Sequence, residues 1–134
     1  MNIILSIHPK WSELIYSGKK ICELRKTFPK NFDPKKDKVY LYETAPVKKV
    51  TGFICLGYYH IQETALHLKL ADELRISISK TSCVPSQEIL EYAKKGNGRI
   101  FFWEILKAVK FDNPFELHEK RAPQSWQYAS VGYM

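Results

Sequence analysis

The chain has 134 residues and a mass of 15.7 kDa, the usual size of one domain, so two independent cores are not expected. Its residues are 45% hydrophobic and 13% aromatic, which is enough for a core without metals or disulfides and excludes a largely disordered chain. No apolar run approaches the roughly 18 residues of a membrane span, and the first residues lack the basic region of a signal peptide. We therefore expect a single cytoplasmic domain over residues 1–134 with no membrane partner.

The charge balance favours an anionic partner. Lysine and arginine outnumber aspartate and glutamate by 21 to 14, giving a net charge of +7 and a pI near 9.3. Residues 1–60 carry +6 of this excess and residues 61–134 only +1. A phosphate backbone is a plausible partner for such a chain. The alternative is a solvated lysine surface that keeps the protein soluble.

The cysteines and histidines do not suggest a metal or disulfide framework. Cys22, Cys55 and Cys83 are odd in number and widely spaced, so we expect free thiols in a reducing compartment. The chain has no C-x-x-C pair, no Walker-type loop and no dinucleotide glycine pattern. We therefore expect neither a metal nor another cofactor.

The first expected elements are a strand over residues 2–7 and a helix that begins at Pro9. The helix is indicated by apolar residues at helical spacing, namely Trp11, Leu14 and Ile15. Gly18 is expected as its left-handed C-cap, after which residues 20–26 are extended.

A basic loop and an antiparallel strand pair follow. Residues 27–38 contain two prolines and several lysines, and we expect a surface loop whose side chains are too polar to pack. Residues 39–43 and 50–59 are rich in β-branched and aromatic residues, and residues 45–48 connect them. We expect both to be strands.

The second half is predicted to contain two helices and a strand. Apolar residues four apart predict a helix over residues 64–75. A second helix is expected over residues 86–95, with Ser86 as its N-cap and Gly96 at its end. Residues 99–109 read as a long apolar strand, and residues 123–128 are apolar enough to pack back on the domain.

The element order favours an α+β fold. Strands two to four follow one another without crossover helices, which disfavours a doubly wound α/β sheet. We expect a small, curved, mostly antiparallel sheet or barrel.

A charged cluster in the extended segment is the main candidate site. Side chains alternate along a strand, so Cys22 and Leu24 share one face while Glu23 and Arg25 share the other. With Lys20 at the preceding helix end, this second face could hold a phosphate, a ribose or a base edge. The alternative is a structural ion pair on an exposed strand.

Aromatic side chains could add stacking surfaces for unpaired bases. Most of them are expected in the core. Tyr42 is the aromatic residue that we favour for a cleft, because it leads to a strand end beside Pro46.

Residues 18–25 read G-x-K-x-x-E-x-R, which resembles the signature of the ASCH domain family, a branch of the PUA-like superfamily. The similarity continues in four further segments along nearly the whole chain: LSIHP at 5–9, YETAPV at 42–47, VTG at 50–52, and PQS at 123–125 followed by Trp126.

The resemblance implies a β-barrel of five or six strands ringed by helices, with a cleft lined by the signature residues. It implies RNA or nucleotide binding, and some members of the family are ribonucleases or nucleoside amidohydrolases. The binding residues that it implies are Lys20, Glu23 and Arg25, with Gly18 shaping the turn and Tyr42 and Ser125 as neighbours.

Three functional interpretations remain open. The first is a module that binds RNA, or a nucleotide or nucleoside, in the basic cleft. The second is a hydrolase of the same fold, either an amidohydrolase on an acylated cytidine nucleoside or a ribonuclease, with Lys20 and Glu23 catalytic. Members that resemble such amidohydrolases have a threonine nucleophile where this chain has Glu23, and Thr27 or Thr44 could substitute only if the fold brings them close. The third is an interaction module for another protein, which rests on the apolar tail. The sequence does not indicate an oligomeric state.

Overall fold

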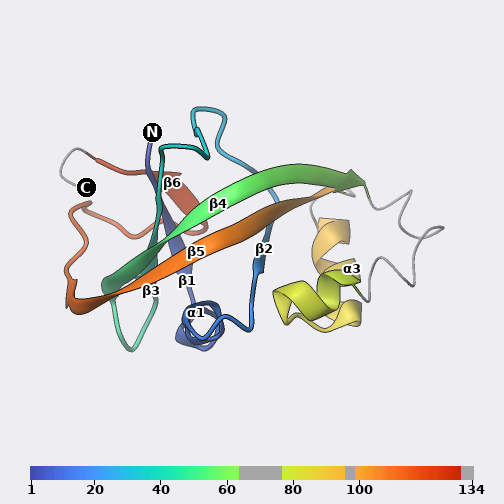
Figure 1. Ribbon diagram of the computed structural model, residues 1–134, viewed down its shortest axis with the longest axis horizontal. Coiled ribbons are helices and arrows are strands. Elements are labelled where there is room, and N and C mark those ends of the chain that lie inside the picture. Colours follow the sequence, from blue (N-terminus) through green and yellow to red (C-terminus); the bar gives the residue numbers. More distant parts are fainter. Residues whose placement is uncertain (64–76, 96–98, 131–134) are drawn as a thin grey trace.

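The computed structural model describes residues 1–63, 77–95 and 99–130, and its centre is a six-stranded curled sheet (Figure 1). The strands are β1 (Ile3–Ile7), β2 (Cys22–Arg25), β3 (Val39–Glu43), β4 (Lys49–Glu63), β5 (Arg99–Phe115) and β6 (Trp126–Tyr128). Their order across the sheet is β2-β5-β4-β3-β1-β6. Only β1 and β3 are parallel; every other neighbouring pair is antiparallel.

Three short helices accompany the sheet in the described residues: α1 (Pro9–Tyr16), a helical segment over residues 77–82, and α3 (Ser86–Lys95). Figure 1 shows α1 and α3 on the same side of the long β4–β5 ribbon. The α+β fold with a mostly antiparallel sheet is therefore confirmed. The sheet is a half-barrel, because β2 and β6 lie at its two edges and do not pair with each other. Within the described ranges, no helix has both the length and the apolar character needed to cross a bilayer.

The curl of the sheet comes from irregular pairing along β4. The register shifts between β3 and β4 at Leu41/Tyr42, and between β4 and β5 at three places. An extra residue on one strand bends it and increases its twist. These shifts let a long ribbon bend around the buried strand β1, whose five residues are all buried.

The start of the chain forms as predicted. His8 caps α1, because its Nδ1 accepts a hydrogen bond from the Lys10 amide at 3.1 Å. Gly18 has a φ of +83°, which confirms the left-handed turn after the helix. The helix over Ser86–Lys95 is also confirmed, but its N-cap was predicted one residue too late: the Pro85 carbonyl, outside the helix, accepts the first helical hydrogen bond, from the Ile89 amide at 3.1 Å. The helix predicted over residues 64–75 and the stop at Gly96 lie outside the described residues.

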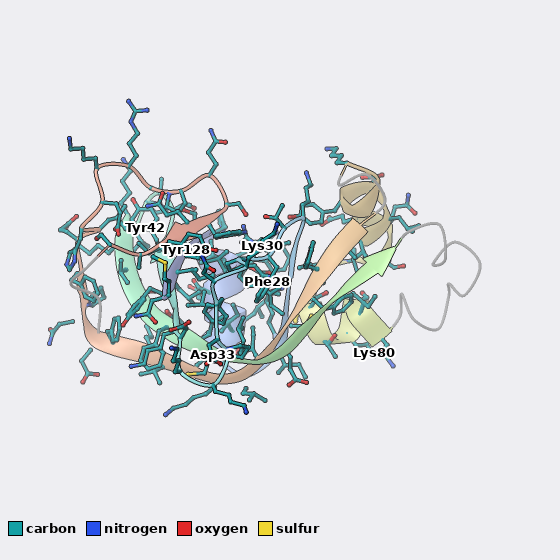
Figure 2. All side chains as sticks on the ribbon, turned by 90° about the horizontal axis from the view of Figure 1, so that it is seen from above. Phe28, Lys30, Asp33, Tyr42, Lys80 and Tyr128 are labelled. Atoms are coloured by element: carbon teal, nitrogen blue, oxygen red, sulfur yellow. The ribbon has the colours of Figure 1, made fainter. Side chains whose placement is uncertain are left out.

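The loop over residues 27–38 is an irregular segment, as expected, but the prediction that its side chains do not pack is wrong. Phe32 is buried in the main core. Phe28, labelled in Figure 2, contacts Phe32 and Trp103 with ring centroids 5.8 and 5.3 Å apart. The lysines dominated the composition of the loop and obscured two aromatic anchors. The loop is therefore fixed to the sheet by its apolar residues.

Two strands, β4 and β5, are longer than predicted, and β6 is an additional strand. Pairing continues outward along the ribbon, so β4 runs to Glu63 and β5 runs to Phe115. The tail packs back as expected, and it also adds the unpredicted strand β6, which pairs antiparallel with β1. Three residues are too few for a periodic pattern to reveal a strand.

Candidate functional site

The site begins at the end of α1. The amides of Lys19 and Lys20 both donate to the Leu14 carbonyl at 3.0 Å, which closes the helix at Gly18 and turns the chain sharply. This turn brings Lys20 back against the helix, with its Nζ 5.1 Å from the centroid of the Trp11 ring. The G-x-K spacing of the signature is thus the spacing of a helix end and the buried side chain just beyond it.

Strand β2 places the next signature residues. Glu23 lies opposite Trp103 of β5, and Arg25 lies opposite Phe101. On the other face, Cys22 and Leu24 join a buried apolar cluster, as predicted. The ion pair of the alternative interpretation is present, with Arg25 NH2 3.0 Å from Oε2 of Glu23. The expectation that it is exposed is wrong, because the Glu23 side chain is only 8% exposed.

Lys20 and Glu23 form an ion pair inside the protein. The Lys20 side chain is 1% exposed, and its Nζ lies 3.3 Å from Oε1 of Glu23. The same ammonium group donates a hydrogen bond of 2.5 Å to the Ser82 carbonyl. Ser82 is the last residue of the helix over residues 77–82, so this contact ties the turn before β2 to the segment that leads into α3.

Arg25 continues the network towards the other edge of the sheet. Its NH2 group donates to Oε2 of Glu23 at 3.0 Å and to the Ser6 carbonyl at 3.1 Å. Its NH1 group donates to Oγ of Ser125 at 3.2 Å. The planar guanidinium thus joins β2, β1 and the segment before β6, a set of contacts that an ammonium group could not reproduce.

The electrostatics of the cluster keep Glu23 ionised. Burial alone would raise the pKa of Glu23, but the charges of Arg25 and Lys20 and the hydrogen bonds to the carboxylate outweigh it, so this pKa lies below its ordinary value of 4.5. Two cations around one carboxylate leave the cluster with one net positive charge. It is therefore suited to an anion or to a group rich in hydrogen-bond acceptors.

A pocket of about 260 Å³ opens onto this cluster. Its charged lining comes from Lys20, Glu23, Arg25 and Glu88, and its remaining lining residues are Trp11, Leu24, Val84, Ile89 and Tyr92. Lysine ammonium groups also lie over both aromatic walls: Lys10 is 4.4 Å from the ring centroid of Trp11, and Lys26 is 4.9 Å from that of Tyr92. The pocket therefore combines a charged floor, two aromatic walls and further positive charge at those walls.

A second hollow of about 560 Å³ adjoins this pocket, because Trp11 and Glu88 line both. Lys10 and Lys19 contribute positive charge to its lining, and Glu13 contributes a negative charge. Trp11 is thus part of the lining of two adjoining hollows.

The candidate residues are only partly brought together. Lys20, Glu23 and Arg25 line one pocket, Gly18 shapes the turn, and Ser125 reaches the site through Arg25. Tyr42 does not line this pocket but packs against the buried cluster of Ile4, Tyr40 and Val50. In Figure 2 it lies towards one end of the molecule and Lys80, of the helix before α3, towards the other.

The two threonines of the hydrolase interpretation do not line the pocket either. Thr27 is exposed, and its Oγ1 accepts a hydrogen bond from Nε1 of Trp126 at 2.9 Å. Thr44 donates its amide to the Ile7 carbonyl at 2.9 Å.

The sequence did not predict the part of the pocket lining that comes from α1 and α3. Tyr92 and Ile89 are three residues apart and so share one face of α3. That spacing was visible in the sequence, but nothing local indicated that this face would lie over β2. Trp11 lines the pocket, whereas the sequence singled out Tyr42 among the aromatic residues that could stack on a base.

Metal-binding geometry is not seen in the described part of the chain, where no three His, Cys, Asp or Glu side chains gather closely enough to hold an ion. The three cysteines are free.

The sequence matches the ASCH domain over residues 5–133, and the chain therefore belongs to the ASCH domain family. The resemblance drawn from the signature and its flanking motifs is confirmed. No curated protein matches the chain in sequence.

Solved structures of the same family have the same fold. The chain is similar to the crystal structure of ASCH from Zymomonas mobilis, with a TM-score of 0.77 and 20% identity over 97% of this chain and 88% of that one. Two mutants of the Zymomonas mobilis protein each give a TM-score of 0.76 at 19% identity over 97% of this chain. The match covers 89% of the serine-to-alanine mutant chain and 91% of the tyrosine-to-phenylalanine mutant chain. At these identities the likeness concerns the fold.

Proposed function

We propose that this protein binds single-stranded RNA and holds one unpaired nucleotide in the pocket formed by α1, β2 and α3. The observation that carries this proposal is the pocket itself, where the buried Lys20–Glu23–Arg25 cluster lies between the aromatic side chains of Trp11 and Tyr92. RNA-binding domains commonly recognise unpaired bases by stacking them on aromatic rings and by contacting their polar edges.

The size and charge of the pocket support a strand rather than a duplex. A volume of about 260 Å³ is slightly below the roughly 300 Å³ of the smallest usual ligand sites, so the pocket has room for at most one nucleotide unit and not for a duplex. Lys10 and Lys26 lie at its aromatic walls and can meet the phosphates of the chain that continues outside. An α-helix that reads a duplex would instead need a basic face, and the described polar residues of α3 include Glu88 and Glu91.

Binding fits the chemistry of Glu23 better than hydrolysis does. A general acid or base works best with a pKa near the working pH. The pKa of Glu23 is lowered, so this carboxylate is already ionised at neutral pH and accepts a proton only weakly. It can instead accept hydrogen bonds from the amino group of a base or from a sugar hydroxyl.

Fluorescence anisotropy of a labelled single-stranded RNA, measured at two salt concentrations, tests the proposal. Trp11→Leu removes an aromatic wall, and we expect it to raise the Kd about tenfold, since a base stack contributes on the order of 1 to 3 kcal/mol. Lys20→Met and Arg25→Lys are expected to weaken binding as well. Phe111→Leu is the matched control, because this half-buried aromatic residue packs against the cluster of Ile4, Tyr40 and Val50 and does not line the pocket.

Two results would contradict the proposal. Equal Kd values for wild type and all three pocket variants would remove RNA from this pocket. RNA cleavage on a gel that disappears in Glu23→Gln, under conditions where circular dichroism shows this variant to be folded, would instead favour the hydrolase interpretation, in which Lys20 and Glu23 are catalytic.

A further inference from the structure

A separate pocket lies on the far side of the β4–β5 ribbon. It has a volume of about 390 Å³ and is lined by residues 34–38 of the loop before β3, by residues 55–57 of β4, and by Leu106 of β5. Figure 1 shows this loop on the side of the ribbon opposite α1. The pocket shares no lining residue with the one proposed to hold a nucleotide.

Three lysines give this pocket its charge. Lys35, Lys36 and Lys38 all line it, and Lys35 and Lys36 are exposed. No carboxylate in the described part of the chain lies within ion-pair distance of any of the three. Nζ of Lys38 lies 4.5 Å from the ring centroid of Phe53. Lys35 and Lys36 therefore supply the exposed positive charge of the hollow, with no salt-bridge partner in the described residues.

The one acidic residue of the lining is turned inward. Asp37 is 9% exposed, and its Oδ2 accepts a hydrogen bond from the Asp33 amide at 2.8 Å. The Asp37 amide donates to the Asp33 carbonyl, also at 2.8 Å. These contacts fold the loop into a turn that buries the carboxylate and leaves the flanking lysines outside.

The floor of the pocket is apolar. Leu56 is buried, while Leu106 is 68% exposed, the largest exposure among the exposed hydrophobic side chains of the described chain. An added Cβ at Gly57 would meet Oε1 of Glu104 first and then Cγ of Leu106 at 2.9 Å, so both side chains pack against Gly57. Glu104 does not itself line the pocket. The hollow thus offers the apolar surface of Leu106 beside the lysines, with one carboxylate behind Gly57.

We infer that this lysine pocket is a second contact site for RNA, in which Lys35 and Lys36 bind backbone phosphates and Leu106 contacts the sugar or base between them. A row of unpaired lysines matches the regular negative charge of a phosphate backbone, and the exposed leucine matches the apolar faces between phosphates. The inference rests on the proposed function in one respect: the lysines indicate a polyanion, and the proposed function identifies that polyanion as RNA.

The test compares two charge-matched double variants of the full chain. Lys35→Gln with Lys36→Gln removes the two exposed lysines of the pocket. Lys48→Gln with Lys49→Gln removes the same charge from two exposed residues, the last before β4 and the first of β4, which do not line the pocket. Each protein is titrated with an RNA of about 20 nucleotides, longer than the roughly 4 to 16 that one small domain covers, and with a trinucleotide.

The inference predicts that only the Lys35/Lys36 variant binds the long RNA more weakly. Its slope of log K against log salt should be smaller by about 1.4, since each phosphate contact to a single strand contributes about 0.7. Trinucleotide binding should be unchanged in both variants. Leu106→Glu places a carboxylate beside the lysines at an exposed position and should weaken long-RNA binding as well.

Equal slopes for the two double variants and the wild type would overturn the inference. It would also be overturned if the Lys35/Lys36 variant kept its RNA affinity but lost binding to a polyglutamate peptide, which would identify an acidic protein surface as the partner. Failure of the wild type to bind the trinucleotide would count against the nucleotide pocket alone, because the slope for the long RNA is measured independently.

Discussion

Arg25 of β2 and Ser125, 100 residues later in the chain, meet through a hydrogen bond of 3.2 Å between NH1 and Oγ. The same guanidinium holds Glu23, which in turn pairs with Lys20. The signature segment and the closing motif of this ASCH domain are therefore parts of one hydrogen-bonded unit, and the site depends on both ends of the chain.

Ser125→Ala should release one side of the Arg25 guanidinium. We expect a loss of about 1 kcal/mol in the free energy of unfolding, the usual value for one hydrogen bond, together with weaker RNA binding. Urea unfolding and anisotropy measure the two effects. Ser130→Ala is the control, because Ser130 is exposed and donates a hydrogen bond to Oε1 of Glu119 through its backbone amide, which the substitution keeps. Identical behaviour of the two variants would show that the Arg25–Ser125 contact is unimportant.

Glu23→Gln should strongly destabilise the protein, because it leaves Lys20 and Arg25 as neighbouring cations with no carboxylate between them. Breaking a buried ion pair in this way costs about 3 to 5 kcal/mol. Adding Lys20→Met to Glu23→Gln should recover part of that loss, since the unpaired buried ammonium is then gone. Urea unfolding of wild type, Glu23→Gln, Lys20→Met and the double variant gives a double-mutant cycle that measures the coupling of the two residues. Additive losses would contradict the coupling of Lys20 and Glu23.

The lowered pKa of Glu23 predicts a specific loss of stability in acid. The folded protein binds this proton more weakly than the unfolded chain, whose pKa is near 4.5. The contribution of Glu23 is therefore complete above pH 4.5 and is lost as the pH falls below 4.5 through the lowered folded-state value. Unfolding measured across this range should show a steeper loss for wild type than for Glu23→Gln. Parallel pH profiles would argue against an ionised, buried Glu23.

Cys22 should be the least reactive of the three thiols. Burial raises the pKa of Cys22 to about 12, so the reactive thiolate is scarce at pH 8, whereas Cys55 and Cys83 are partly exposed. A thiol reagent should therefore modify at most two cysteines rapidly in the native protein and the third only after unfolding. Cys22→Ala should leave the rapid count unchanged. A lower rapid count in that variant would place Cys22 at the surface.

Much of the fold followed from local patterns. The proline start and glycine end of α1, the alternation in β2 and the β-branched strands each depend on residues close together in sequence, and all are confirmed. The pairing of β6 with β1 depends on distant segments and was not predicted. Phe28 and Phe32 were hidden for the same reason, because their partners lie on β5 and in the core.

The candidate site also has a part that local sequence predicts and a part that depends on tertiary contacts. The Lys20, Glu23 and Arg25 side chains are set by one turn and one strand, so their proximity could be predicted. Tyr92, which lines the pocket, belongs to α3. The Ser82 carbonyl that accepts a hydrogen bond from Lys20 belongs to the helix before α3. Their position over β2 is a tertiary contact, and no local pattern encodes it.

The most direct test of RNA binding in this pocket is an NMR titration of the tryptophan indole N–H signals with single-stranded RNA. The chain has three tryptophans, of which Trp11 lines the pocket, Trp103 is fully buried and Trp126 donates to Thr27. Assignment uses Trp11→Phe. If RNA occupies the pocket, the Trp11 signal shifts or broadens with saturation while the Trp103 signal moves least. An unchanged Trp11 signal at saturating RNA would contradict the account.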